Sequence, residues 1–398
     1  MIKKPELLAP AGSVEGLQTA LRFGADAVYV GGPMLQLRAD AAAFTIEELA
    51  GAVSMTHSRG KKLYVTVNSF VRTGELKQLA GYARELCALG IDAVIVSDIG
   101  AMCTIREAAP ELELHVSTQA NCLNSAAARH YYELGAKRIV PAREMTLEEI
   151  RILRAEIPED MEIECFIHGA MCMAYSGRCL ISAYMNGRSG NRGDCSQPCR
   201  YRYVLSEAGK DGEYYPVGED ERGTTILSSR DLNAMPFLDE LTAAGVSSLK
   251  IEGRMKSSYY TATVVNAYRR RLDGTASPEE CERELDCASH REYFSGFYFG
   301  RALTAKAEAL GYRSDCTFIA LVLGEAEGGY LIEQRNNFST GDRLEILSPN
   351  SLGLYFEVGE MTTEEGETVT YAPHPQQKLI IKCPHKLEAG DILRRRMK

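Results

Sequence analysis

Short apolar runs alternate with amphipathic helical patterns over the first two thirds of the chain. The run "AVYVGG" is followed by the helical pattern "TIEELAGAVSMTHSRG", and "KLYVTVN" opens the next unit. Apolar strands separated by helices of this length indicate parallel β-strands joined by right-handed crossovers. About eight such units fit the chain, and no G-x-G-x-x-G sequence follows a strand. The pattern therefore favours an α/β fold of the TIM-like (β/α) barrel type over a dinucleotide-binding sheet.

The pattern changes twice along the chain. The helical rhythm breaks between about 170 and 225, and from about 316 apolar and polar positions alternate at period two. We therefore predict a (β/α) barrel domain over 1–271, which carries an insertion over 170–225 at its mouth. A linker with one short helix follows over 272–315, and a small all-β barrel domain occupies 316–398.

Polar residues gather where the predicted barrel strands end. In a parallel barrel these ends meet at one mouth, where active sites lie. One polar residue there is often only a helix cap, but a ring that contains several cations suits a small ligand with more than one negative charge. The candidates for substrate binding are Arg38, Asn121, Arg143, Lys250 and Arg254. The candidates for orienting the ligand or moving protons are Asn68, Gln119, His168 and Glu252.

The composition is that of an ordinary globular protein. Together with the distribution of apolar residues, it indicates the cellular compartment. The chain has 398 residues, a formal net charge of −9 and 12 cysteines. The negative charge argues against nonspecific coating of nucleic acid but is compatible with a local basic face. Pro5 precedes any long apolar run, and no stretch approaches the roughly 20 apolar residues of a membrane helix. We therefore expect a cytoplasmic protein whose cysteines do not form structural disulfides.

Four cysteines cluster in the expected insertion, with the spacing Cys172-x6-Cys179-x15-Cys195-x3-Cys199. Thiolates bind soft metals, so the group suits an iron–sulfur cluster or a zinc ion, and four packing thiols without a metal are the third interpretation. The irregular spacing and the intervening glycines favour a loop around the larger cluster. Cys172 or Cys179 with His168 as its base also fits a peptidase, but such a pair usually needs an orienting Asn or Asp and an oxyanion hole as well. A peptidase also has no evident use for four clustered thiols.

Several motifs together resemble the collagenase-like peptidase family of unknown catalytic type, class U, number 32. They include "ELLAPAGS", "STQAN", "RIVPARE", "EIECFIHGAMCMAYSGRCLIS" and "LKIEGRMKS", and "NNFSTGDRLEILSPN" extends the resemblance into the C-terminal part. The family name implies proteolysis, whereas the better understood branches imply iron–sulfur proteins that support oxygen-independent hydroxylation. The cysteine spacing and the element "SSRDL" are most similar to the branch that hydroxylates the wobble uridine of tRNA at C5 with prephenate.

This resemblance implies a ligand set and a partner. The four clustered cysteines would hold a [4Fe–4S] cluster, and the cations at the mouth would bind the two carboxylates of prephenate. Phosphates of the tRNA anticodon loop would be contacted by Arg188, Arg192, Arg200 and Arg202. A base of that loop would stack on Tyr175, Tyr184 or Tyr201. The alternatives are a peptidase, a hydroxylase of a quinone precursor or of ribosomal RNA, and a zinc-stabilised RNA-binding protein.

Overall fold

The computed structural model describes residues 4–37, 43–172, 174–201, 230–300, 312–349 and 351–397, with the pairs 205–206, 214–215, 219–220 and 223–224. The chain divides into two compact units. The first comprises Met1–Leu21, Ala25–Lys256 and His290–Tyr312, and the second comprises Arg22–Gly24, Ser257–Ser289 and Arg313–Lys398. Two predicted ligand-binding residues, Arg38 and Arg202, lie outside the described residues.

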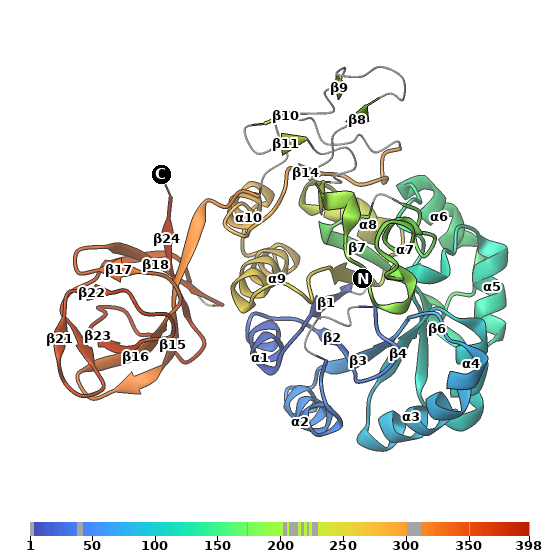
Figure 1. Ribbon diagram of the computed structural model, residues 1–398, viewed down its shortest axis with the longest axis horizontal. Coiled ribbons are helices and arrows are strands. Elements are labelled where there is room, and N and C mark those ends of the chain that lie inside the picture. Colours follow the sequence, from blue (N-terminus) through green and yellow to red (C-terminus); the bar gives the residue numbers. More distant parts are fainter. Residues whose placement is uncertain are drawn as a thin grey trace. The chain divides into compact units, whose positions relative to one another are not determined.

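Eight parallel strands of the first unit close into a barrel, which confirms the fold predicted from the alternating pattern (Figure 1). Their hydrogen-bonded order is β13-β1-β2-β3-β4-β5-β6-β7, and β7 pairs with β13 to complete the ring. The strands are β1 (Glu6–Pro10), β2 (Ala27–Gly31), β3 (Lys62–Val67), β4 (Ala93–Val96), β5 (Glu113–Val116), β6 (Ala136–Ile139), β7 (Glu162–Ala170) and β13 (Ser248–Ile251).

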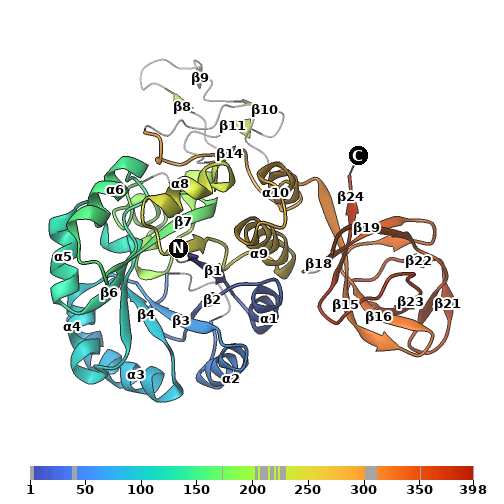
Figure 2. The same cartoon turned by 180° about the vertical axis from the view of Figure 1, so that it is seen from behind.

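Helices connect these strands, and α2 to α6 lie on the outer face of the barrel in both views (Figures 1 and 2). The connecting helices are α1 (Val14–Arg22), α2 (Ile46–His57), α3 (Leu76–Leu89), α4 (Ile99–Ala108), α5 (Ser125–Glu133), α6 (Leu147–Glu156) and α8 (Leu238–Ala243). Local sequence sets their ends: Thr45 and Glu48 form a capping box at the start of α2, and Gly90 ends α3 in the left-handed conformation. Within the described residues, none of the helices has the length and apolar character needed to span a membrane.

Two short strands outside the ring of eight form a rim beside the end of β7. Strand β12 (Asp231–Asn233) pairs antiparallel with the end of β7, and β14 (Tyr293–Phe294) pairs parallel with β12. The short helices of the first unit are η1 (Thr73–Glu75), η2 (Thr118–Ala120), α7 (Ile181–Asn186), η3 (Gly190–Arg192), η4 (Pro198–Arg200) and η5 (Met235–Phe237). Two small antiparallel pairs, β8 (Leu205–Ser206) with β9 (Tyr214–Tyr215) and β10 (Glu219–Asp220) with β11 (Gly223–Thr224), complete its described part.

The second unit is an antiparallel β domain with two helices, as the period-two pattern predicts for its strands. The main sheet has the order β19-β18-β24-β15-β16-β23-β20-β21, and β17 pairs with β22. The elements are α9 (Ser258–Asp273), α10 (Pro278–Leu285), β15 (Cys316–Ala326), β16 (Gly329–Gln334), β17 (Phe338–Ser339), β18 (Arg343–Ser348), β19 (Ser351–Glu357), β20 (Met361–Thr363), β21 (Thr368–Val369), β22 (Tyr371–Ala372), β23 (Lys378–Ile381) and β24 (Ile392–Arg396).

The second unit begins earlier in the chain than 316, because side-chain contacts hold α9 and α10 to the C-terminal strands. Tyr259 of α9 stacks on Phe318 of β15 with ring centroids 5.2 Å apart. Fully buried Arg394 of β24 pairs with Glu284 of α10 at 2.7 Å and with Glu345 of β18 at 2.9 Å. These contacts group α9 and α10 with the β domain, whereas the sequence analysis assigned them to the barrel and to a linker.

A network of buried charges occupies the interior of the barrel. Glu164 of β7 accepts hydrogen bonds from Lys250 Nζ at 2.7 Å and from Arg138 Nη1 at 3.1 Å. Arg138 also pairs with Glu6 of β1 at 2.7 Å, and Tyr64 of β3 donates to Glu6 at 2.7 Å. Such interiors are usually filled by branched apolar side chains. Here charges join β1, β6, β7 and β13, and each buried charge has a partner that offsets its desolvation.

We expect Glu164→Gln to lower the free energy of unfolding in urea by about 3–5 kcal/mol, because the change leaves two buried cations with less compensation. Burial alone would raise the pKa of Glu164, but Lys250 and Arg138 together lower it. A carboxylate with a lowered pKa stabilises the fold above its unfolded pKa of about 4.3 and loses this contribution in more acidic solution. The difference between wild type and Glu164→Gln should therefore shrink as the pH falls below about 5.

Arg151→Ala is the control for this measurement, because Arg151 and Glu148 form an exposed pair at 3.2 Å. Its effect should stay below about 1 kcal/mol. A Glu164→Gln variant as stable as wild type at neutral pH, or a difference independent of pH, would contradict the role assigned to the buried network.

Candidate functional site

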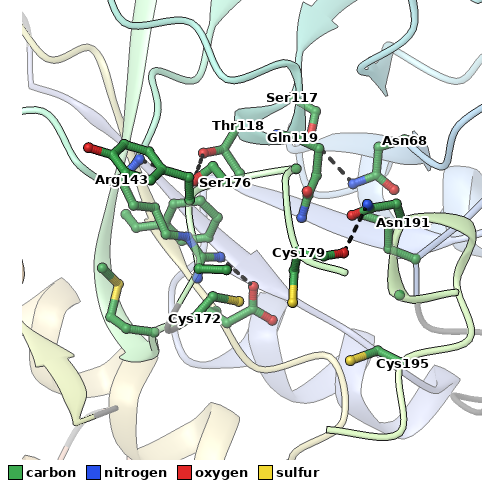
Figure 3. Close-up of a pocket in the computed structure, with 18 of the residues that line it drawn as sticks. Asn68, Ser117, Thr118, Gln119, Arg143, Cys172, Ser176, Cys179, Asn191 and Cys195 are labelled. Atoms are coloured by element: carbon green, nitrogen blue, oxygen red, sulfur yellow. Dashed lines mark hydrogen bonds and ion pairs between the residues drawn. The ribbon is translucent and has the colours of Figure 1, made fainter. Parts of the chain in front are cut away.

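A cavity of about 130 Å³ lies at the carboxyl ends of the barrel strands, where the sequence predicts a binding site. Figure 3 shows this region from one side. The predicted residues that line the cavity are Asn68, Gln119, Arg143, Lys250, Glu252, Arg254, Cys172, Cys179, Cys195 and Cys199. The barrel thus gathers at one cavity residues that lie up to 186 positions apart (254 − 68) in the chain.

The three cations of the cavity all have partners in the protein. Arg143 Nη2 lies 3.2 Å from Glu252 Oε2, and the guanidinium carbon lies 3.9 Å from the ring centroid of Phe166. Lys250 Nζ bonds Glu164 at the floor and lies 4.5 Å from the ring centroid of Tyr29. Arg254 Nη1 donates to Gln36 Oε1 at 2.8 Å, a neutral acceptor. Two carboxylates therefore offset part of the positive charge that the sequence analysis assigned to this mouth.

Amides and hydroxyls form the opposite wall. Ser117 Oγ accepts the backbone N–H of Gln119 at 3.2 Å and lies 3.5 Å from Asn68 Nδ2. The oxygen Oδ1 of Asn68 is buried and has no hydrogen-bond partner among the described residues. Gly177 packs against Gln119 with φ of +70°, and a Cβ at this position would collide with the carbonyl oxygen of Gln119. The close approach of the cysteine loop to this wall therefore needs glycine.

The four clustered cysteines lie around the cavity, and Figure 3 shows the sulfur atoms of Cys172, Cys179 and Cys195 directed toward one open space. The thiol of Cys199 has a raised pKa, because it is partly buried and because the other three cysteines are near enough to oppose its ionisation. Among the described residues, no three His, Cys, Asp or Glu side chains are arranged to hold a single metal ion. Four soft donors around one space fit a metal group larger than an ion, because such a group separates its ligands further.

Two sets of polar contacts, here called clasps, attach the loop that carries Cys172 to Cys199 to the barrel. The first joins Ser176, between Cys172 and Cys179, to Glu144 after β6: the Ser176 N–H donates to Glu144 Oε1 at 3.0 Å and its hydroxyl to Oε2 at 3.1 Å. Both contacts hold the first cysteine pair over the barrel mouth.

The second clasp joins η3 to η1. Arg192 Nη2 lies 2.8 Å from Glu75 Oε1, and Arg192 Nη1 lies 3.2 Å from Glu75 Oε2. Asn191 accepts the N–H of Phe70 at 3.0 Å through its carbonyl and donates from Nδ2 to the carbonyl of Cys179 at 3.1 Å. Hydrogen bonds to Arg192 and to the Arg72 N–H lower the pKa of Glu75 to about 2. The arginine that the sequence assigns to RNA thus anchors the loop between Cys179 and Cys195.

His168 does not line the cavity. The ladder between β7 and β13 shifts register after Lys250, and His168 pairs with Asn233 of β12. A shift of this kind redirects the side chains that follow it. The His168 ring is buried, its Nε2 lies 3.4 Å from the hydroxyl of Tyr293, and burial lowers its pKa to about 3. The imidazole is therefore packed in the rim and does not share the cavity with the cysteines.

The other predicted residues are divided between the interior of the loop and its surface. Arg188 pairs with Asp194 at 2.7 Å, whereas Arg200 is exposed. Asn121 adopts the left-handed conformation with φ of 56° after η2 and is not among the residues that line the cavity. The sequence analysis missed Glu164, although a glutamate inside the apolar strand "IECFI" was a visible signal of a buried ionic partner.

Two family models match most of this chain. The model of peptidase family U32 matches residues 12–308, and that of the peptidase family U32 C-terminal domain matches residues 314–394. The chain is 34% identical to tRNA hydroxylation protein P of Escherichia coli (strain K12), over 98% of this chain and 96% of the relative. It is 37% identical to tRNA hydroxylation protein P1 of Bacillus subtilis (strain 168), over 99% and 95%. It is also 33% identical to a collagenase of Porphyromonas gingivalis (strain ATCC BAA-308 / W83), over 98% and 97%.

We expect Glu75→Gln to loosen the second clasp, because the change removes the charge that holds Arg192 at two points. In metal-free protein the alkylation of Cys179 and Cys195 by iodoacetamide should become several-fold faster, as measured by mass spectrometry of the labelled peptides. Cys103, which is exposed on α4, is the internal control and should react at an unchanged rate. If each of the three cysteines reacts at the same rate in the variant as in the wild-type protein, the clasp does not order the loop.

Proposed function

The chain belongs to peptidase family U32, and from this premise we propose that it hydroxylates the wobble uridine in the anticodon loop of tRNA at C5. The two relatives named tRNA hydroxylation proteins that are given above match nearly the whole chain and are themselves covered over 95% or more of their length. This match supports an activity of the same class rather than a shared domain alone. A cytoplasmic location follows from the substrate under this proposal.

The observation that carries the proposal is the joint placement of four cysteines and three cations at one barrel mouth. A peptidase needs one nucleophile with its base and has no use for four thiols around a cavity. A redox group beside a site for a small anion is what hydroxylation without molecular oxygen requires. Both features come from separate parts of the chain and meet only in the folded barrel.

The cysteines would hold the metal group. Under the proposal Cys172, Cys179, Cys195 and Cys199 ligate a [4Fe–4S] cluster. Four thiol donors spread around one cavity favour this group over a single zinc ion, because a cluster separates its ligands further. When bound, such a cluster supplies one-electron redox chemistry. The two clasps hold the ligands in place, and backbone N–H groups of the glycine-rich loop can donate to the sulfides.

The cavity wall opposite the amides would bind the co-substrate. We assign prephenate to this position as the source of the hydroxyl group, with its carboxylates held by Arg254, Arg143 and Lys250. Glu252 keeps the guanidinium of Arg143 in place, and the faces of Tyr29 and Phe166 limit access of water to Lys250. Asn68 and Gln119 would orient the reacting groups, because Asn68 Oδ1 is available to accept a hydrogen bond from a ligand.

One observation supports the alternative hypothesis of a peptidase: the chain is similar to a protein named collagenase. A cysteine peptidase requires a histidine in contact with its nucleophile. His168 does not line the cavity that the four cysteines line, and burial lowers its pKa to about 3. The geometry therefore favours hydroxylation over proteolysis.

The decisive test is mass spectrometry of tRNA nucleosides from a strain that lacks this gene and any paralogue. We expect 5-hydroxyuridine to disappear and to return with the wild-type gene or with Cys103→Ser. Genes carrying Cys172→Ser or Cys199→Ser should fail to restore it, because each loses a cluster ligand. Unchanged 5-hydroxyuridine in the deletion strain would overturn the assignment. Protein purified without oxygen should contain about four irons per chain, and stoichiometric zinc without iron would exclude the cluster.

The co-substrate assignment predicts a loss of affinity in Arg254→Lys. This change keeps the positive charge but removes the planar fork that grips a carboxylate at two points. We expect prephenate to bind about 10-fold to 100-fold more weakly in isothermal titration calorimetry. Arg84→Ala, which removes an exposed arginine on α3, should bind as wild type does. An unchanged affinity in Arg254→Lys with a normal melting temperature would remove Arg254 from the site.

A further inference from the structure

The short helix α7, between Cys179 and Cys195, buries a serine and exposes a tyrosine, while its first residue, Ile181, lines the cavity. Its serine Ser182 is buried and accepts the N–H of Ser196 at 3.0 Å, and Asn186 Nδ2 donates to the hydroxyl of Ser196 at 2.8 Å. The polar residues of α7 therefore face the cysteine loop. Helices of globular proteins usually bury their apolar side and expose the polar one.

The large apolar residues around α7 point outward instead. Tyr184 is 91% exposed, Leu180 is 70% exposed, and Tyr175 is 59% exposed. Tyr175 also lines the cavity, and Leu180 follows the cavity residue Cys179 directly. A group of exposed large apolar side chains next to a functional cavity is typical of a surface that binds a partner.

Arginines flank these residues, and the structure separates them into two classes. Arg188 and Arg192 form ion pairs with Asp194 and Glu75 within the first unit. Arg178 and Arg200 are exposed, and neither forms an ion pair or a side-chain hydrogen bond with another of the described residues. Their guanidinium groups are available to a negatively charged partner.

We propose that Tyr175, Arg178, Leu180, Tyr184 and Arg200, here called the α7 face, form the surface on which a single-stranded RNA loop docks. The inference rests on the proposed function and names the side chains that receive the RNA. Exposed aromatic rings accept unstacked bases of a loop, and arginines bind the phosphates between them. A double-stranded segment hides its base faces and cannot use the tyrosines. The partner is therefore a loop and not a helical stem.

The position of the face also suits entry of a nucleotide into the cavity. Arg178 precedes Cys179 and Arg200 follows Cys199, so the two cations stand on either side of the cysteine group along the chain. Tyr175 lines the cavity, so a base of the bound loop that stacks on Tyr175 would lie at the cavity wall. The face thereby determines which part of the RNA reaches the reactive site.

The test is fluorescence polarisation with a labelled anticodon stem-loop RNA and the full-length protein, at several salt concentrations. Tyr184→Ala should weaken binding about tenfold and leave the salt dependence unchanged, because a ring supplies stacking and no charge. The double variant Arg178→Ala/Arg200→Ala should also weaken binding. Its affinity should depend less on salt: the negative slope of log K against log salt should become smaller in magnitude by about 1.4, roughly 0.7 for each lost phosphate contact.

Two controls match the changes in residue type. Tyr371→Ala removes a half-exposed tyrosine of the second unit, and Arg84→Ala removes an exposed arginine of α3. Both should bind RNA as wild type does. Melting curves check that the variants are folded, which is expected because Tyr184 and the two arginines are exposed.

The outcomes separate the α7 face from the proposed function. Wild-type binding by both the Tyr184 variant and the double variant would overturn the α7 face and leave tRNA hydroxylation standing. Equal affinity for a duplex without a loop would overturn it as well. Absence of RNA binding by the wild-type protein would contradict both, whereas the nucleoside analysis tests the hydroxylation without reference to the docking surface.

Discussion

Glu164 is the residue on which the arrangement of the barrel interior and of the site floor depends. Its carboxylate is fully buried and bonds two cations from neighbouring strands, Lys250 and Arg138. In a low-dielectric interior, each of these charges is tolerated only because the others are present. The same contact determines where Lys250 Nζ lies, and Lys250 lines the cavity. Stability of the barrel and electrostatics of the site are therefore coupled through one carboxylate.

The cations of the cavity above this floor are largely balanced by carboxylates. Glu252 pairs with Arg143, and Glu164 pairs with Lys250, while Arg254 contacts neutral acceptors such as Gln36. A site in which cations are held by internal partners is ordered before the ligand arrives, which lowers the cost of binding. This arrangement favours a small ligand whose few charges match the geometry over nonspecific capture of polyanions.

Polar contacts at two points along the cysteine loop hold it to the barrel. Ser176 binds Glu144, and Arg192 binds Glu75, so each cysteine pair has its own attachment to the barrel. Loops that carry function are commonly positioned in this way by a rigid scaffold. Among the described residues of the same loop, Tyr184 and Arg178 are exposed, and the structure shows no comparable side-chain attachment for Arg178. Under the proposed docking of RNA, anchoring and recognition are divided between different residues of one loop.

The sequence by itself determined the fold class, because hydrophobic periodicity records which side of each strand or helix is buried. It also predicted the four cysteines and most of the strand-end residues that line the cavity, because chemistry and spacing are local properties. The orientation of individual side chains depended on the tertiary structure. Lys250 meets Glu164 across 86 positions of the chain, His168 is turned into the rim by a register shift, and Arg192 is paired while Arg178 is not. Such pairings form only when distant strands and loops are brought together, and a loop without periodicity gives no advance sign of which arginine will face inward.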